Sequence, residues 1–248
     1  MKANNTTEKF IVVTGGSGGI GEAIAKIFSP SYTVLLHYHN SIDNAKRIES
    51  DLKQNNGKVH LIKADLANEK GCLEFFNTVR GITDRIDILV NNSGGIIKRH
   101  AVGEIGWDLI QKHFELNTFS TILLSSLFVP LLEKGIDPSV INITSGSIRQ
   151  GGPTATLYAA SKGAVDVFTR GMALEMAPNI RINAIAPGVI DTNFQKNTPD
   201  ERLKSLILKT PLNRLGTAHD VAQTALFLSQ STFTTGETID VNGGLLMR

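Results

Sequence analysis

Short apolar or β-branched runs alternate with longer segments of helical periodicity along nearly the whole chain of 248 residues. The runs are apolar at consecutive positions, as in strands covered by helices on both faces. Parallel strands need helical crossovers, so this alternation predicts an α/β fold with a doubly wound, parallel, seven-stranded sheet. The predicted strands are Phe10–Thr14, Thr33–His37, Val59–Lys63, Ile86–Val90, Val140–Thr144, Ile180–Ala186 and Thr238–Val241.

The apolar spacing between these strands predicts six helices. They cover Gly19–Phe28, Ile42–Gln54, Lys70–Gly81, Trp107–Glu133, Thr156–Met176 and His219–Leu228. No linker interrupts the pattern, so we expect a single domain over residues 1–248. The polar segment from Asp191 to Gly216 departs from the rhythm of strands and helices, and we expect it to form an inserted lid. The apolar residues of the lid either cover a substrate or simply pack it against the body.

Composition narrows the class of partner. The chain has 41% hydrophobic and 19% charged residues, a formal charge of +2 and no basic stripe for nucleic acid. Cys72 is the single cysteine, which excludes an internal disulfide and is typical of a reducing compartment. His37 and His39 have no third ligand in view, so no metal site is predicted. The polar start, Met1 to Lys9, resembles neither a signal peptide nor a membrane span. We expect a cytoplasmic protein whose partners are small molecules, with no role at a membrane.

The turn after the first predicted strand is rich in glycine. Residues 14–21 read TGGSGGIG, with Gly15, Ser17, Gly18, Gly19 and Ile20 inside the turn. Glycines let the backbone turn tightly and approach a pyrophosphate at the positive end of the next helix. A structural turn alone would also explain the glycines, but the strand before it and the helix after it favour a dinucleotide site.

The end of the second strand bears on the choice of cofactor. Tyr38, His39, Asn40 and Ser41 stand where an NAD-specific site usually offers a carboxylate to the ribose 2′-hydroxyl, and no acid precedes Asp43. Without a carboxylate to repel a 2′-phosphate, we predict NADP(H), with hydrogen bonds from His39, Asn40 and Ser41. NAD(H) is also compatible, because residues 38–41 at the end of the strand include no arginine.

Three further strand ends carry polar or glycine residues, and all should meet at one edge of the sheet. They are Asp65 and Leu66 after the third strand, Asn92, Ser93 and Gly94 after the fourth, and Pro187 and Gly188 after the sixth. Asp65 is expected to accept from an adenine amino group or a backbone amide, and a helix cap is an equal alternative. Asn92 to Gly94 leave room for the backbone to approach the cofactor's ribose.

The remaining strand end supplies reactive groups. Ser145 follows the fifth strand, and Tyr158 and Lys162 lie four residues apart on one face of the next helix. A phenol with a pKa of about 10 is a poor acid or base at neutral pH, and a lysine ammonium beside it stabilises the phenolate. We predict that Tyr158 exchanges a proton with the substrate oxygen, that Ser145 hydrogen-bonds this oxygen, and that a nicotinamide supplies the hydride. Taken singly, a tyrosine and a lysine at helical spacing are usually a surface pair, and a serine after a strand is usually a turn residue. Their expected position at the same edge of the sheet favours catalysis.

These residues resemble the short-chain dehydrogenase/reductase family over nearly the whole chain. The shared motifs are Thr14-Gly15 with Gly19-Ile20-Gly21, Asn91-Asn92-Ser93-Gly94, Ser145, Tyr158-Ala-Ala-Ser-Lys162 and Pro187-Gly188 with Thr192. The resemblance implies a Rossmann fold and an NAD(P)-dependent oxidoreductase. It also implies that Asn117 kinks its helix and holds a water in a proton relay from Lys162, that Lys162 contacts the nicotinamide ribose, and that Ile190 and Thr192 contact the carboxamide.

Two positions depart from the family pattern. Ser93 stands where alanine is usual, and Gly18 stands where many NADP-preferring members carry arginine or lysine, which weakens the NADP(H) prediction. The segment from Thr235 to Gly244 is similar to the C-terminal strand of the 3-oxoacyl-[acyl-carrier-protein] reductase branch, with Asn242 where aspartate is commoner. In this family tetramers are common.

We therefore expect an NADP(H)-dependent oxidoreductase, similar to 3-oxoacyl reductases, that acts on a carbonyl or secondary alcohol and forms a homotetramer or dimer. One alternative is an NAD-dependent alcohol or sugar dehydrogenase. Another is a non-catalytic dinucleotide-sensing regulator, since a fold does not guarantee catalysis. A sensor has no physical need for a lysine-assisted phenol beside the nicotinamide, which argues against the second alternative.

Overall fold

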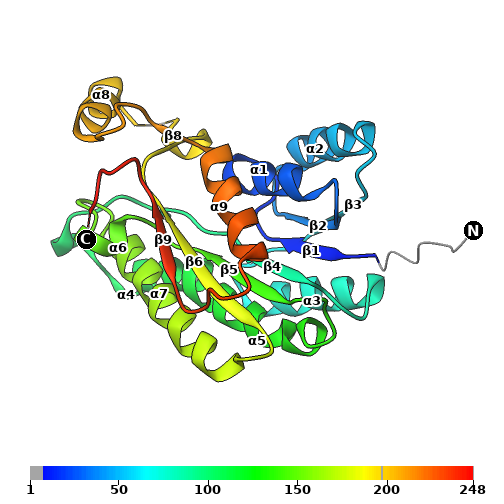
Figure 1. Cartoon of the computed structure of the whole chain (residues 1–248). Coiled ribbons are helices and arrows are strands. Elements are labelled where there is room, and N and C mark those ends of the chain that lie inside the picture. The colour runs from blue at the N-terminus through cyan, green and yellow to red at the C-terminus, as the bar shows by residue number, and fades with distance from the viewer. Residues whose placement is uncertain (1–7, 197, 248) are drawn as a thin grey trace, which may run out of the picture.

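The computed structural model describes residues 8–196 and 198–247. Its centre is a seven-stranded parallel sheet with the order β3-β2-β1-β4-β5-β6-β9 (Figure 1). The chain runs outward from β1 in one direction and from β4 in the other, which confirms the predicted doubly wound sheet. The strands are β1 (Phe10–Val13), β2 (Thr33–Tyr38), β3 (Val59–Lys63), β4 (Ile88–Asn91), β5 (Ser139–Ile143), β6 (Arg181–Pro187) and β9 (Thr238–Val241).

Helices cover both faces of this sheet (Figure 1). On one face lie α1 (Gly19–Phe28), α2 (Ile42–Gln54) and α9 (Ala218–Gln230), which bury Phe28 and Ile48 among others. On the other lie α3 (Glu69–Ile82), α5 (Ser120–Leu132) and α7 (Thr156–Met176), which bury Phe75 and Phe128. Every residue of β5 and β6 is buried as a result. This double coverage is why the strands are apolar at consecutive positions.

The bounds of α1, α2, α7, β3 and β9 are those predicted, and the other predicted strands and most helices agree within two residues at either end. The exception is the long helix predicted over Trp107–Glu133. It consists of α4 (Trp107–Phe114), one π-helical turn, η2 (Glu115–Phe119), and α5. The Nδ2 of Asn117 donates to the main-chain carbonyl of His113 at 2.9 Å. A side chain therefore hydrogen-bonds a helix carbonyl at the turn where the helix widens.

The same stretch, Trp107–Leu132, is long and apolar enough to cross a membrane by length and composition. Half of the residues in its most apolar 18-residue stretch are buried inside the protein. Leu124 and Phe128 pack there in the core between the sheet and α3, α5 and α7. Burial of this kind is typical of the core helix of a globular domain, so the apolar character of the stretch has a structural explanation.

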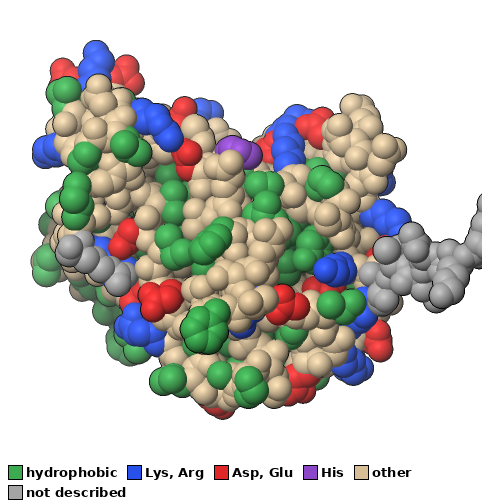
Figure 2. Space-filling model, viewed as in Figure 1, with side chains coloured by type: hydrophobic (Ala, Val, Ile, Leu, Met, Phe, Trp, Pro, Cys, Tyr) green, Lys and Arg blue, Asp and Glu red, His purple; other side chains and the backbone are tan. Residues whose placement is uncertain are grey.

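The segment predicted as a lid contains regular structure that the sequence analysis missed. A short strand pair, β7 (Ile190–Asp191) with β8 (Gly216–Thr217), closes its base. Between them lie a 3-10 turn, η3 (Asn193–Gln195), and α8 (Asp200–Lys209), in which no residue is fully buried. Two more short helices were missed, η1 (Val102–Glu104) and α6 (Ser147–Gln150). Figure 2 shows the surface hollowed between α8 and the lobe of α1 and α2.

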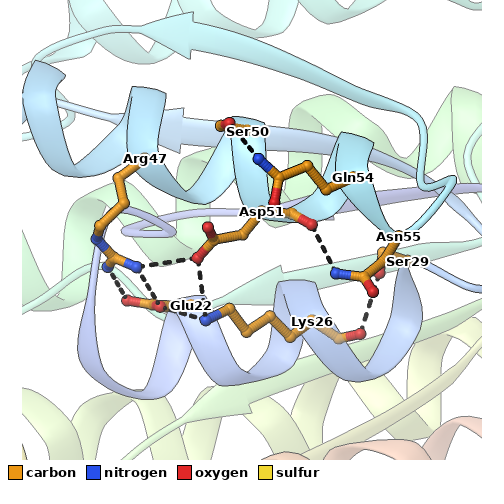
Figure 3. Close-up of polar contacts among 8 residues, drawn as sticks. All are labelled: Glu22, Lys26, Ser29, Arg47, Ser50, Asp51, Gln54 and Asn55. Carbon is orange, nitrogen blue, oxygen red and sulfur yellow. Dashed lines mark hydrogen bonds and ion pairs between the residues drawn. The ribbon is translucent and has the colours of Figure 1, made fainter.

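Charged side chains tie α2 to α1 (Figure 3). The Arg47 guanidinium donates to both carboxylate oxygens of Glu22, at 2.7 and 3.1 Å, and to Asp51 at 3.2 Å. Lys26 reaches Glu22 at 2.7 Å and Asp51 at 3.6 Å. A bidentate pair within a network of several charges is the arrangement in which partly exposed ion pairs contribute to stability. The network therefore holds α2 against α1.

His37 ends the strand predicted over Thr33–His37, and the structure gives its side chain a role that no sequence pattern revealed. The side chain lies within β2, buried beneath the glycine turn. Its Nδ1 accepts from the Gly15 amide at 2.9 Å, so Nε2 carries the proton and donates to the Ala64 carbonyl at 3.1 Å. Burial lowers the pKa of His37 to about 4. The neutral imidazole thus links the glycine turn to β2 and the end of β3.

This linkage predicts how stability responds to acid. Between pH 6.5 and about 4, His37 is protonated in the unfolded chain but not in the folded one. The contribution of neutral His37 to the free energy of unfolding should therefore be fully present above pH 6.5. It should be lost as the pH falls through this window, and the loss due to His37 should be at most about 3 kcal/mol. In urea unfolding, His37→Gln should lose less stability across the window than the wild type.

The matched control is His219→Gln, because His219 is an exposed histidine on α9. This variant should keep the pH dependence of the wild type. An identical slope in His37→Gln and the wild type would show that His37 does not titrate as its burial demands.

Candidate active site

The carboxyl ends of β1, β4, β5 and β6 meet around a cavity of about 390 Å³. β1 and β4 are neighbours from which the chain departs in opposite directions, which is where ligands bind in open parallel sheets. Most of the predicted site residues line this cavity: Gly15, Ser17, Gly18, Gly19, Ile20, Ser41, Asn92, Ser93, Gly94, Ser145, Tyr158, Lys162, Pro187, Gly188, Ile190 and Thr192. Lining residues that the sequence analysis missed are Asn44, Ile143, Thr144, Asn193, Phe194 and Gln195.

Five predicted cofactor residues do not line the cavity: Tyr38, His39, Asn40, Asp65 and Leu66. The Asp65 carboxylate accepts from the Ala67 amide at 3.1 Å and from the Asn68 side chain at 2.8 Å. Asp65 thus organises the turn before α3, whose cap is Asn68. The Leu66 side chain is buried in the core. His39 lies 3.9 Å from Asp65, and both are about half exposed beside the cavity.

The glycine turn leaves the N-terminus of α1 open toward the cavity. Gly15 and Gly19 have φ angles of +61° and +53°, a region that favours glycine. Gly18 caps α1 without any side-chain hydrogen bond, and a Cβ on it would meet no atom within 4 Å. The first amides of α1 are therefore uncapped and face open space at the positive end of the helix dipole. This arrangement fits the pyrophosphate of a dinucleotide.

Asn92 and Ser93 hold β4 against the glycine turn. The Asn92 side chain donates to the carbonyls of Thr14 and Gly15 at 2.9 and 3.0 Å. The Thr14 hydroxyl accepts from the backbone amides of Asn92 and Ser93, both at 2.9 Å. The Ser93 hydroxyl, at the position where the family usually has alanine, is buried without a hydrogen-bond partner among the described residues. It is therefore free to bind a ligand in the cavity.

Tyr158 and Ser145 form the reactive centre. Ser145 follows β5 and lies within hydrogen-bonding reach of the Tyr158 phenol. Its Oγ accepts from the amide and the hydroxyl of Ser147, at 3.2 and 2.9 Å, so its own proton is free to be donated. Burial raises the pKa of Tyr158, and the Ser145 hydrogen bond opposes this only in part. The phenol is thus held protonated, ready to act as an acid.

Lys162 is almost completely buried, at 3% exposure. Its Nζ donates to the Ile143 carbonyl at 2.7 Å, and burial lowers its pKa to about 8. The stabilisation of the Tyr158 phenolate by Lys162 stays a prediction. A buried lysine with such a pKa can both give up and take back a proton near neutral pH.

Asn117 connects these groups to the segment after β4. Its side chain lies fully buried in η2, accepts from the Gly95 amide at 2.8 Å and donates to the Gly95 carbonyl at 3.0 Å. Gly94 has a φ of +153°, and a Cβ there would lie 2.6 Å from the Asn117 Oδ1 and 2.9 Å from the Lys162 Nζ. The glycine therefore lets Asn117 and Lys162 approach the same backbone. The helix widening at Asn117 is the kink that the family resemblance implied.

The segment after β7 lies over the reactive centre. The Phe194 ring stands 6.1 Å from the Tyr158 ring, and a Cβ placed on Gly19 would lie 3.4 Å from the Thr192 side chain. No sequence signal marked Phe194, because a single aromatic residue in a polar segment has many uses. Trp107 is 79% exposed, and His100 is buried against His113, so neither lines the cavity. Among the described residues, no three His, Cys, Asp or Glu side chains gather to hold a metal ion.

Comparison with known proteins agrees with this geometry. The family model described as enoyl-(acyl carrier protein) reductase matches residues 15–246. The 3-oxoacyl-[acyl-carrier-protein] reductase FabG of Thermotoga maritima is 31% identical, over 96% of this chain and 98% of that protein. Glucose 1-dehydrogenase 2 of Bacillus subtilis is 32% identical over 97% and 96%. The 7alpha-hydroxysteroid dehydrogenase of Escherichia coli K12 is 31% identical over 95% and 93%.

Solved structures show the same relationship. A short-chain dehydrogenase/reductase of the glucose/ribitol dehydrogenase kind from Brucella melitensis superposes with a TM-score of 0.89 at 29% identity, over 97% of both chains. An NADH-dependent reductase responsible for alginate metabolism, A1-R', has a TM-score of 0.89 at 26% identity, over 97% of this chain and 98% of that one. With the family's motifs gathered on one cavity, this chain belongs to the short-chain dehydrogenase/reductase family and is an NAD(P)-dependent oxidoreductase.

Proposed function

We propose that this enzyme is an NADP(H)-dependent carbonyl reductase, similar to 3-oxoacyl reductases, in which Tyr158 gives its proton to the substrate oxygen. The observation that carries the proposal is the meeting of a protonated phenol, a serine with a free proton and the open N-terminus of α1 on one cavity. The relatives named above act on acyl, sugar and steroid substrates, so they support the reaction type rather than one substrate.

The residues have distinct roles in this proposal. When bound, NADP(H) supplies or takes the hydride. The amides of α1 and the glycine turn would hold its pyrophosphate, Lys162 would contact its nicotinamide ribose, and Ile190 and Thr192 would contact its carboxamide. Ser145 donates its free proton in a hydrogen bond to the substrate oxygen, and Tyr158 protonates this oxygen as negative charge develops on it. Lys162 returns a proton toward the site, with Asn117 holding the surrounding backbone and a relay water in place.

The preference for NADP(H) rests on the β2–α2 connection. Ser41 and Asn44 line the cavity and offer hydrogen bonds, and residues 38–41 include no carboxylate. Arg47 is committed to Glu22, so a 2′-phosphate would be bound by hydroxyl, amide and imidazole donors. An NAD-dependent alcohol or sugar dehydrogenase is the alternative within the same reaction type.

We also propose a homo-oligomer, a tetramer or dimer, located in the cytoplasm. The support for oligomers is an unpaired apolar face on α7 and its neighbour α5, with Val167 61% exposed, Leu174 84% and Ile122 37%. The support for the cytoplasm is a chain whose single cysteine leaves no internal disulfide to form in an oxidising compartment.

The proposed reaction is tested by Tyr158→Phe. The variant should keep the fold and bind nucleotide, yet lose most of its turnover, on the order of 100-fold or more, because no other group replaces the proton donor. The measurement is initial-rate loss of NADPH and of NADH against 3-oxoacyl thioesters, diketones, quinones and keto sugars. Near-normal turnover in the variant would rule out the proton-donor role, and nucleotide binding without turnover in the wild type would favour the sensor.

Lys162→Ala should weaken both turnover and nucleotide affinity, since Lys162 acts on the proton and on the ribose. Turnover is measured as kcat, and affinity by fluorescence titration with NADPH. Unchanged affinity with reduced kcat would remove the ribose contact from the proposal and leave the proton role.

The cofactor preference is tested by Ser41→Asp. The new carboxylate should lower kcat/KM for NADPH by about tenfold or more through repulsion of the 2′-phosphate, and leave NADH little changed. Ser50→Asp adds the same charge elsewhere on α2 and should not change the ratio. Equal losses with both nucleotides in Ser41→Asp would contradict binding of a phosphate there.

A further inference from the structure

Ser147 is bound to the hydroxyl of Ser145 through two hydrogen bonds. It is the first residue of α6, and it is half-buried. Its backbone amide donates to the Ser145 Oγ at 3.2 Å, and its own hydroxyl donates to the same atom at 2.9 Å. A serine hydroxyl has two acceptor positions and one proton. Both acceptor positions of Ser145 are therefore filled by one neighbour, and only its proton is left for another partner.

The backbone around Ser147 is fixed by two other strands of the sheet. The Gly146 amide donates to the Pro187 carbonyl, at the end of β6, at 2.7 Å. A Cβ on Gly146 would lie 3.2 Å from the same carbonyl oxygen, so the turn packs tightly there. The Arg149 Nε donates to the Asp240 carboxylate, on β9, at 3.2 Å. These anchors on either side of Ser147 hold its amide and its hydroxyl against Ser145.

Ser147 has no access of its own to the reactive cavity. Ser145 and Tyr158 line the cavity, and Ser147 is not among the described residues that do. The turn that Ser147 begins, α6, lies just before α7, the helix that carries Tyr158 (Figure 1). Any effect of Ser147 on the reaction must therefore pass through Ser145 or through the shape of this turn, and experiment can separate the two routes.

The filled acceptor positions of Ser145 determine how Tyr158 can use its proton. Ser145 lies within hydrogen-bonding reach of the Tyr158 phenol. A Ser145 hydroxyl with a vacant lone pair would accept from this phenol, and the proton needed by the substrate would then point at Ser145. With both lone pairs occupied by Ser147, the phenol has no acceptor there and its proton remains available to a substrate oxygen. Ser145 itself can only donate, which suits an oxygen that gains negative charge.

We propose that Ser147 is a positioning residue of the reaction, which makes Ser145 a hydrogen-bond donor only and reserves the Tyr158 proton for the substrate oxygen. This inference rests on the proposed function, because it needs Tyr158 to be the proton donor. Ser147 touches neither substrate nor nucleotide in this proposal. Its contribution should therefore appear in the rate of the reaction and not in the binding of either ligand.

The first test is Ser147→Ala, assayed with a carbonyl compound on which the enzyme shows Tyr158-dependent turnover. The variant keeps the hydrogen bond from its amide and loses the one from its hydroxyl. We expect kcat to fall by about tenfold, with KM and NADPH affinity as in the wild type. Ser147→Thr keeps a hydroxyl and should restore kcat to within about threefold of the wild type. Gln150→Ala, at the exposed end of α6, controls for the turn itself and should keep the wild-type kcat.

The second test compares Ser145→Ala with the double variant Ser145→Ala/Ser147→Ala. If Ser147 acts through Ser145, its loss has no further effect once the Ser145 hydroxyl is gone, so both variants should have the same kcat. A residue that only shapes the turn would reduce kcat by the same factor in either background. Single-turnover measurements, with enzyme in excess over NADPH, keep the slow variants measurable.

The outcomes distinguish this inference from the proposed function. Wild-type kcat in Ser147→Ala, no recovery in Ser147→Thr, or losses that multiply in the double variant would each overturn the role of Ser147 and leave the reductase intact. A raised KM with unchanged kcat would place Ser147 in ligand binding and would also contradict the inference. Turnover that persists in Tyr158→Phe, or no turnover with any compound, would overturn the proposed function, and the role of Ser147 would fall with it.

Discussion

The hydrogen bonds that hold the turn between β1 and α1 are the constraint on which the site depends. The Gly15 amide is bound by His37 from β2, and the Thr14 and Gly15 carbonyls by Asn92 from β4. These contacts come from both sides of β1, so the turn cannot shift without disturbing two strands. Because His37 and Asn92 hydrogen-bond the backbone of the turn, the turn keeps its shape and leaves the first amides of α1 uncapped toward the cavity. A buried neutral histidine thus supports a site built to receive negative charge.

The reactive half of the site depends on a second set of backbone contacts. The Asn117 side chain accepts a hydrogen bond from the Gly95 amide and donates one to the Gly95 carbonyl. The π-helical turn at Asn117 places the side chain there. Lys162 is held by the Ile143 carbonyl at the end of β5, beside Gly94. Because these groups are buried with few alternative partners, their positions follow from the packing of α5 and α7 on the sheet. The rigid body thus positions the proton-handling groups, while α8 and the segment before it carry exposed residues suited to substrate selection.

Much of this arrangement was predictable from local patterns. The sheet, its flanking helices and most of the cavity residues follow from strand ends that carry glycine, serine, asparagine or tyrosine, since all parallel strands end on one edge. Other features were not predictable in this way. The amphipathic α8 was hidden by the surrounding polar residues and prolines. Asp65 hydrogen-bonds the turn before α3, close to the cap role that was its alternative, and the cofactor contacts of Asp65 and Leu66 stay predictions. The burial of His37 was not predicted, because a polar residue at a strand end gives no sign of being buried.

The sequence by itself determined the α/β class, the order of elements, the family and the spacing of Ser145, Tyr158 and Lys162, because periodicity and motif spacing are local properties of the chain. Only the tertiary structure decided which groups surround the reactive ones: Lys162 is buried with its Nζ on the Ile143 carbonyl, and the Phe194 ring stands 6.1 Å from the Tyr158 ring. It also decided that Asn117 meets Gly95, 22 positions earlier in the chain, through two hydrogen bonds. Burial and charge proximity arise when distant segments pack together, and no local pattern encodes them.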